Sequence, residues 1–366
     1  MKASYFFIGI ILLFSLSACN VDFNDFSQDR IQYAKENKGD IVFAVFDRIY
    51  PEKSEYVRGI QLAAEVINKR PQKLLNGREL KLLIHHDNDD FIDMQSTIRS
   101  VASNPKVTAT LGHYSSHMAF PASLIYEKSK ILFFPPISTS PLLTRHGFQY
   151  IFPMLPNNEV MAAQLVSISK ALRYEKLVLM YSRDNYNQEL ALNFREAALK
   201  RKANVVKSIS FFSKSQDYRT VIADLLNEDF DAIALFTGVK PAINMVKQMR
   251  QMGIKHPIMA NDALNSDDYL KAGEFTNNTL VPTYYQQNIA TPENLFFTKK
   301  YKKKYNEKPG DLAAQGYDTV MLLSHLINLN QSTVPTFLVS TLHYNMPFWV
   351  GATGIHHFDS DGIIDG

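Results

Sequence analysis

The chain has 366 residues, of which 46% are apolar and 20% charged, a balance that suits a packed globular protein and excludes a disordered one. Its 39 basic and 36 acidic residues give a net charge of +3, without the strong basic footprint of a typical nucleic-acid-binding protein. The single cysteine, Cys19, excludes an internal disulfide, a cysteine-based zinc site and a redox pair of thiols.

The first 18 residues have the anatomy of a signal peptide. Lys2 provides a positive start, and the apolar run over residues 5–16 is too short to span a membrane comfortably. The stretch LSAC at 16–19 resembles the lipobox of bacterial lipoproteins, in which the cysteine becomes the first mature residue and carries lipid. We therefore expect residues 1–18 to be removed and Cys19 to anchor the protein to a membrane. The alternative is an ordinary leader with a chance cysteine.

After this leader, residues 19–39 are polar, and we expect a tether that is at most partly helical. From Ile41 onward, apolar strands alternate with helices of about 10–15 residues. The patterns predict strands at 41–46, 80–84, 107–111, 131–134, 149–152, 177–181, 204–211 and 232–236 and near 258 and 280, and helices at 54–68, 92–103, 115–127, 158–172, 186–201, 217–227, 240–252, 292–305, 310–329 and 334–342. Such alternation predicts α/β architecture with parallel sheets covered on both faces, and the length suits two such lobes.

The sequence lacks the common motifs of catalytic and nucleotide-binding sites, such as GxSxG, the P-loop and GxGxxG. His113 and His117 have the i, i+4 spacing of a helical metal site, but the helix is expected to begin near residue 115, which places His113 outside it. Asp87, Asp89 and Asp90 lack the glycine and glutamate of a calcium loop, and we expect a solvated strand end there. No metal or cofactor is therefore expected.

Two hydroxyl-rich loops follow predicted strands, at 112–116 and 136–141. The first leads into a helix, whose free backbone N–H groups and dipole favour a carboxylate, and serine or threonine hydroxyls add neutral donors. The alternative is plain helix capping by Ser115 or Ser116 together with turn chemistry at 138–141. The residues by themselves favour neither interpretation.

The order of several segments resembles that in branched-chain amino-acid-type substrate-binding proteins of ABC importers, which are type I periplasmic binding proteins. In residues 111–144 the shared features are a glycine, a serine pair, a Pro-Ala-Ser helix, an apolar strand and a Pro-x-x-Thr-x-Pro loop. The other segments are 58–68 (RGIQLAAEVIN), 76–89 (NGRELKLLIHHDND), 296–323 with its Gly-Tyr-Asp signature, and 351–362 (GATGIHHFDSDG). The resemblance covers about residues 41–362.

This resemblance implies two Rossmann-like three-layer lobes around a ligand cleft. Lobe 1 would comprise residues 40–154 and a return segment at 286–366, and lobe 2 would comprise residues 155–285. The final crossover into lobe 2 that family members have is expected to be absent.

The family's ligand site also transfers to positions of this sequence. Ser116 and Thr139, with backbone groups near Tyr114 and Ile137, would bind a ligand carboxylate. In lobe 2, Tyr186 matches a ligand-facing position, and Asp262 falls where the family often has an acidic partner for the ligand's ammonium group.

The resemblance therefore predicts an extracytoplasmic lipoprotein that delivers an amino acid or similar small carboxylate to an ABC permease. Such a protein would be anchored in the bacterial cell envelope, facing the periplasm or the cell exterior. The loop 47–53 is more charged than in the family, and Arg48 or Lys240 would either serve a more acidic ligand or form solvated rims.

Two other functions stay open. One is a non-transport envelope lipoprotein, a sensor or an activator of a cell-wall synthase, because such activators use a similar fold. The other is a hydrolase that uses Ser116 with His113 or His117, although no acid partner or oxyanion pattern accompanies these residues.

Overall fold

The computed structural model describes residues 26–36, 38–71, 74–75, 77–143, 147–346, 348–359, 362 and 364. The predicted leader and Cys19 lie outside the described residues. Within the described part of the chain, no helix is both long and apolar enough to cross a bilayer.

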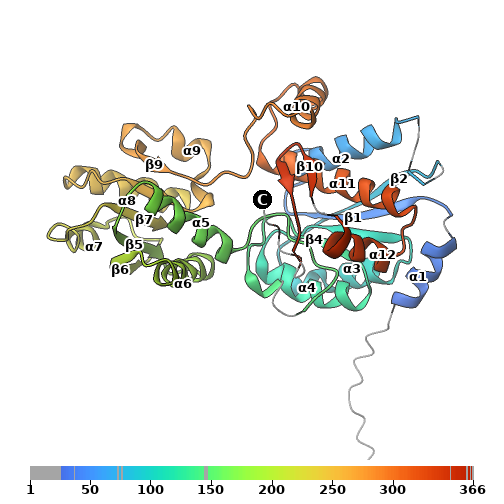
Figure 1. The fold of residues 1–366 in the computed structure, drawn as a ribbon, viewed down its shortest axis with the longest axis horizontal. Coiled ribbons are helices and arrows are strands. Elements are labelled where there is room, and N and C mark those ends of the chain that lie inside the picture. The colour runs from blue at the N-terminus through green and yellow to red at the C-terminus, as the bar shows by residue number, and fades with distance from the viewer. Residues whose placement is uncertain are drawn as a thin grey trace, which may run out of the picture.

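Two lobes lie side by side, each built on a parallel sheet (Figure 1). In lobe 1 the strand order is β2-β1-β3-β4, and the strands are β1 Ile41–Asp47, β2 Leu80–His86, β3 Val107–Leu111 and β4 Leu132–Phe134. One core joins the sheet to α2 (Glu55–Asn68) and α11 (Asp311–Asn330), and a second joins it to α3 (Phe91–Ser103) and α4 (Ser116–Lys128). Lobe 1 is thus a three-layer unit. Its central strand β1 is buried along its whole length and is apolar from Ile41 to Phe46, as expected for a strand covered on both faces.

Lobe 2 repeats this plan with the strand order β6-β5-β7-β8-β9. Its strands are β5 Lys176–Ser182, β6 Asn204–Phe211, β7 Ala232–Phe236, β8 Ile258–Ala260 and β9 Thr279–Leu280. Helices α5 (Asn158–Ala171) and α6 (Asn185–Lys200) share one core with the sheet, and α7 (Arg219–Ala223), α8 (Val239–Gln251) and α9 (Asp267–Leu270) share the other. The predicted α/β architecture with two lobes is confirmed.

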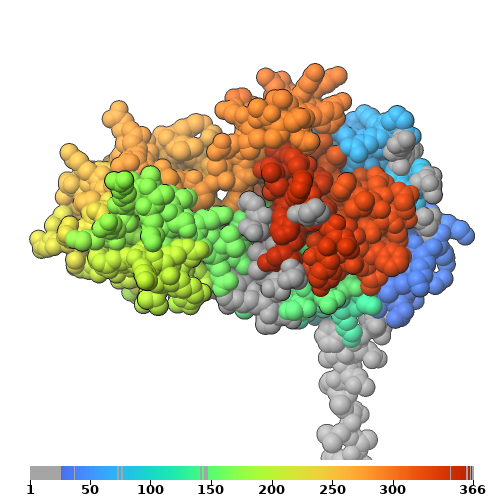
Figure 2. Space-filling model, viewed as in Figure 1, coloured from blue at the N-terminus to red at the C-terminus, as the bar shows by residue number. Residues whose placement is uncertain are grey.

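After β9 the chain contributes again to the core of lobe 1. This return segment contains α10 (Pro292–Tyr305), α11, α12 (Pro335–Ser340) and a hairpin of β10 (Trp349–Gly351) and β11 (Gly354–His356). Figure 2 shows the C-terminal part of the chain, in red, on lobe 1 beside the junction between the lobes. The chain thus passes between the lobes twice, in the segment before α5 and in the segment after β9. Elements from distant parts of the sequence therefore meet at this junction.

Three local predictions differ from the structure. The strand expected at 149–152 is reduced to a single bridge between Ile151 and Phe133, and the chain bends just after it, at Met154 and Leu155. The helix expected at 217–227 is α-helical only over Arg219–Ala223. The β10–β11 hairpin was not predicted, since strands of three residues are too short to show a two-residue alternation.

Helix α1 (Ser27–Glu36) lies within the stretch for which we expect a tether. Its Arg30 is buried, and the guanidinium donates to the backbone oxygens of Ala102, Asn104, Val107 and Ser129 at 2.5–2.9 Å. Burial lowers the pKa of Arg30 to about 10. Since β3 begins at Val107, these bonds hold α1 at the amino edge of the sheet, opposite the edge where α/β proteins bind ligands.

Candidate functional site

Tyr114 follows β3, and its side chain is buried in the interior of lobe 1. The Tyr114 hydroxyl donates to Asp47 Oδ2 at 3.2 Å, and Asp47 also accepts from the Ser54 hydroxyl. Burial, together with the negative charge of Asp47, raises the pKa of Tyr114 well above its ordinary value. Ser54 in turn caps α2 by accepting from the Val57 N–H at 3.1 Å. These bonds fix the loop after β1. Because the Tyr114 hydroxyl is used in them, only the backbone of Tyr114 is left to bind a ligand.

The solvated strand end expected after β2 is wrong for Asp87, which is 1% exposed. Asp87 Oδ2 lies 2.5 Å from His113 Nδ1, and His113 Nε2 lies 3.2 Å from the Tyr126 hydroxyl. Burial favours the neutral acid, but the hydrogen bond and charge of His113 outweigh it and lower the pKa of Asp87. The sequence conceals this pair because its members are 26 residues apart and meet only when β2 and β3 flank β1.

Ser116 is the first residue of α4 and is exposed. Its hydroxyl lies 2.9 Å from that of Ser138, next to the buried Thr139 in the loop after β4. Ser115 makes no side-chain cap on α4 and instead donates its hydroxyl to Asp89. Capping by Ser115, one part of the alternative to ligand binding, is therefore not formed, and the first turn of α4 keeps donors suited to an anion.

The hydrolase arrangement is not assembled in this structure. The ring nitrogens of His113 are paired with Asp87 and Tyr126, and the exposed His117 Nε2 lies 3.1 Å from the Asp89 carbonyl oxygen. The hydroxyl of Ser116 is paired with Ser138, so neither histidine is its hydrogen-bond partner.

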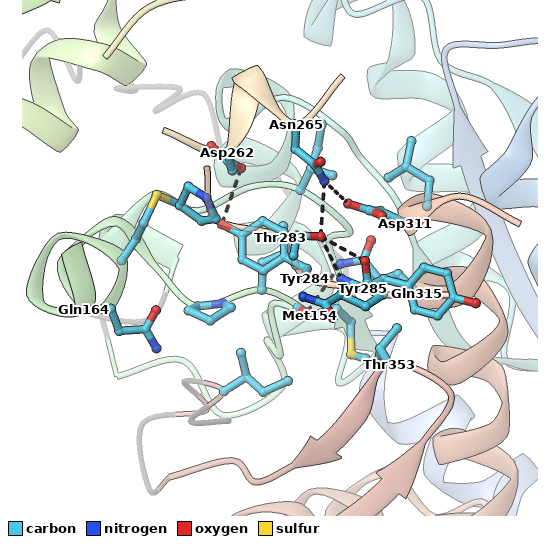
Figure 3. Close-up of a pocket in the computed structure, with 18 of the residues that line it drawn as sticks. Met154, Gln164, Asp262, Asn265, Thr283, Tyr284, Tyr285, Asp311, Gln315 and Thr353 are labelled. Carbon is cyan, nitrogen blue, oxygen red and sulfur yellow. Dashed lines mark hydrogen bonds between the residues drawn. The ribbon is translucent and has the colours of Figure 1, made fainter. Parts of the chain in front are cut away.

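In lobe 2 the predicted residues Tyr186 and Asp262 meet. The Tyr186 hydroxyl donates to Asp262 Oδ1. The Tyr284 hydroxyl lies 3.4 Å from Asp262 Oδ2 (Figure 3). Burial raises the pKa of Asp262, partly offset by the two tyrosine hydroxyls. Tyr284, on the segment that leads back to lobe 1, is a partner that sequence reasoning missed.

A pocket of about 700 Å³ lies beside this carboxyl group, between residues of both lobes and both connecting segments. It is lined by Ile137, Met154, Leu155, Pro156, Met161, Gln164, Ile168, Asp262, Ala263, Asn265, Pro282, Thr283, Tyr284, Tyr285, Gln286, Ile289, Asp311, Leu312, Gln315, Thr353, Ile355, His356 and Ile364. Its size and mixed apolar and polar lining are typical of small-molecule sites.

Of the residues predicted from the sequence, Ile137 and Asp262 line this pocket. Tyr186 does not line it but donates a hydrogen bond to Asp262. Tyr114, Ser116 and Thr139 are not among the lining residues. The polar residues of α11, Asp311 and Gln315, do line it, and the sequence carried no signal for them beyond the start of a helix after Gly310.

No group of three or more histidine, cysteine, aspartate or glutamate side chains in the described part of the chain is arranged to hold a metal ion. The predicted site residues accordingly offer hydrogen-bond donors and single carboxylates rather than a set of metal ligands.

Comparisons with known proteins agree with this architecture. The family model described as "Periplasmic binding protein" matches residues 52–362. The chain is 26% identical over 219 residues to the amino acid binding protein of Pseudomonas aeruginosa, a match that covers 58% of this chain and 57% of that protein. It is also 26% identical over 277 residues to the Leu/Ile/Val-binding protein of Escherichia coli K12, covering 74% of this chain and 73% of that protein.

Two solved structures of an ABC transporter substrate-binding protein from Desulfitobacterium hafniense superpose with TM-scores of 0.80 and, in complex with Leu, 0.78. Both are 24% identical in sequence and cover 90% and 89% of this chain and 95% of the solved chain. Since the family model spans residues 52–362 and the two-lobed fold agrees, the chain belongs to the periplasmic binding protein family and has its type I fold, with similarity to branched-chain amino-acid-binding members.

Proposed function

We propose that this protein captures an amino acid or similar small carboxylate outside the cytoplasm and delivers it to an ABC importer. The observation that carries the proposal is the partly buried carboxyl group of Asp262, which lines a pocket between the two lobes. The relatives support it, because they are binding proteins rather than enzymes and one neighbouring structure contains leucine.

The proposed binding mode uses both lobes. The ligand's ammonium group would bind Asp262, whose position is fixed by Tyr186 and Tyr284. Its carboxylate would bind the hydroxyl of Ser116 and the free N–H groups at the start of α4, near Thr139. A ligand held from both lobes favours the closed arrangement, which presents a changed surface to a permease.

We expect Asp262→Asn to weaken binding of the protein's amino-acid ligand by about 30-fold or more, because loss of one member of a buried charge pair costs about 2–5 kcal/mol. The ligand is first identified by a thermal-shift screen of amino acids and small carboxylates, and its affinity is then measured by calorimetry. The pKa of Asp262 is raised, so Asp262 takes up a proton at a higher pH than an ordinary aspartate does. Acidification should therefore begin to weaken binding at a higher pH than it would with an aspartate of ordinary pKa.

The matched control is Asp268→Asn, which removes an exposed carboxylate of the same lobe. It should leave affinity unchanged. Equal binding by Asp262→Asn and the wild type would contradict the proposed ammonium site, and a folded chain that binds no amino acid or small carboxylate would contradict the function.

We further propose that Cys19 carries lipid and holds the protein on a membrane of the cell envelope. We expect the wild-type chain in the membrane fraction of a bacterial host and Cys19→Ser in the soluble fraction, because two or more acyl chains are needed for stable anchoring and the variant has none. Ser15→Ala, which lies outside the LSAC stretch, is the control and should stay in the membrane fraction. Equal fractionation of Cys19→Ser and the wild type would contradict the anchor.

A non-transport role, as a sensor or as an activator of a cell-wall synthase, stays the alternative proposal. In the charged loop after β1, the Arg48 guanidinium carbon lies 5.4 Å from the centre of the Tyr114 ring. Arg48 also pairs with Asp89 at 3.6 Å, so this loop lies against the residues that precede α4. Arg48 and Lys240 are absent from the lining of the pocket, which supports solvated rims over a site for an acidic ligand. Co-purification with a synthase and not with a permease would favour this alternative.

A further inference from the structure

The formally charged side chains that line the pocket beside Asp262 are all acidic. Its lining includes two aspartates, Asp262 and Asp311, but no lysine and no arginine. Neither carboxylate forms an ion pair with a cationic side chain in the described part of the chain. The pocket therefore presents negative charge that the protein itself does not neutralise there.

Asp311 is held at the pocket by a contact between the lobes. Its Oδ2 accepts a hydrogen bond from Asn265 Nδ2 at 2.7 Å, which joins the first residue of α11 to the loop after β8 (Figure 3). Burial raises the pKa of Asp311, and the negative charge of Asp262 raises it further. An aspartate in the first turn of a helix is common, since it faces the positive end of the helix dipole, but this does not account for a second partly buried carboxylate in the same pocket.

A second feature, independent of the aspartates, also points to a ligand. Gln315 lies one turn after Asp311 on α11 and is 6% exposed. Its Nε2 donates to the carbonyl oxygens of Pro136 at 2.6 Å and Met154 at 3.3 Å, which settles the orientation of the amide. Gln315 Oε1 is then a buried acceptor in the pocket lining, without a hydrogen-bond partner among the described residues. Such a group costs free energy unless a ligand or water donates to it.

His356 Nδ1 is a further acceptor, as the positions of the available protons show. The single hydroxyl proton of Thr353 goes to Asp318 Oδ2 at 2.6 Å, so Thr353 Oγ1 can only accept from His356 Nε2, 2.7 Å away. In the neutral ring, Nδ1 is then an acceptor. His356 is 8% exposed, lines the pocket and has no partner for Nδ1 in the part of the chain described.

We infer that this pocket selects a ligand with two cationic, N–H-rich ends, of the class of basic amino acids, over neutral aliphatic amino acids. Asp262 takes the α-ammonium group, and Asp311 with Gln315 Oε1 takes the side-chain cation. The apolar lining, including Met154, Pro156 and Ile289, contacts the methylene chain between them. The inference rests on the proposed function, because it names the substrate class of the same cleft.

The test compares two ligands that differ mainly in the terminal ammonium group, L-lysine and L-norleucine, by calorimetry with the full chain. We expect lysine to bind at least about tenfold more tightly than norleucine, with a preference that falls as salt rises. Asp311→Asn should weaken lysine binding at least about tenfold and change norleucine binding less than about twofold. Asp268→Asn, the control, should leave both affinities unchanged.

Norleucine or leucine binding as tightly as lysine, or lysine binding unchanged in Asp311→Asn, would overturn the inference and leave the proposed function standing. The comparison of the two ligands on the wild-type chain is decisive even if the variant does not fold. Absence of binding by lysine, arginine, norleucine and small carboxylates to a folded chain would overturn both proposals. The two failures are thus distinguishable.

Discussion

Replacement of Gly59 by valine should destabilise lobe 1 by more than about 3 kcal/mol, above the usual range of about 1–3 kcal/mol for overpacking. A β-carbon at Gly59 of α2 would stand 2.0 Å from the backbone oxygen of Ala313 on α11. At Gly316 of α11, it would stand 2.5 Å from the backbone oxygen of Tyr56. Because the obstacles are backbone atoms, the two helices must separate, and α11 would move with its pocket residues.

The measurement is chemical unfolding followed by tryptophan fluorescence. Trp349 is the only tryptophan of the chain and packs against the core of lobe 1, so the signal reports this lobe. Gln61→Val, at a half-buried position of the same helix α2, is the control, and it should cost at most about 1 kcal/mol, because valine is only slightly less favourable in a helix. A Gly59→Val protein with wild-type stability would show that α2 and α11 are not in contact through their backbones.

Replacement of Asp87 by alanine should cost lobe 1 about 3 kcal/mol, the upper end of the range for leaving a buried hydrogen-bonding group without its partner. The variant leaves His113 Nδ1 buried without its partner at 2.5 Å. Asp93→Ala, at an exposed position on the neighbouring α3, should change stability by less than about 0.5 kcal/mol. In a double-mutant cycle, His113→Phe should cost less in the Asp87→Ala background than in the wild type.

The same pair predicts a pH dependence. Since the pKa of Asp87 is lower in the folded than in the unfolded chain, its contribution is fully present above the ordinary aspartate pKa of about 4 and is lost as pH falls through the lowered value. The stability difference between wild type and Asp87→Ala should therefore shrink in acid. A difference that stays constant from neutral pH down to the acid transition would contradict this role of His113.

The fold could be predicted from the sequence because its signals are local. A continuously apolar run such as residues 41–46 is typical of a strand buried on both faces, and alternation with amphipathic helices predicts parallel pairing through βαβ units. Helix α10 begins and ends where it was predicted, since Thr291 and Pro292 mark its start and a left-handed Asn306 its end. Short elements escaped prediction, as the three-residue strands of the β10–β11 hairpin show.

The candidate site was predictable only in part. Tyr186 and Asp262 were named from the family resemblance, and the structure brings their side chains together across 76 residues of sequence. The resemblance also named Ile137, which lines the same pocket, whereas Ser116 and Thr139 lie at the start of α4 and in the loop after β4. Their part in binding a carboxylate stays a prediction.

By itself, the sequence determined the alternation of strands and helices and identified the lone Cys19 as the candidate lipid anchor, because patterning and signal-peptide motifs need no partner. Only the tertiary structure decided which charges are compensated. Arg30 is satisfied by four backbone oxygens and Asp87 by His113, whereas Asp262 and Asp311 have no cation beside them in the described part of the chain. Whether a charged group has a partner depends on residues far apart in the sequence, and burial raises the free-energy cost of a charge that has none.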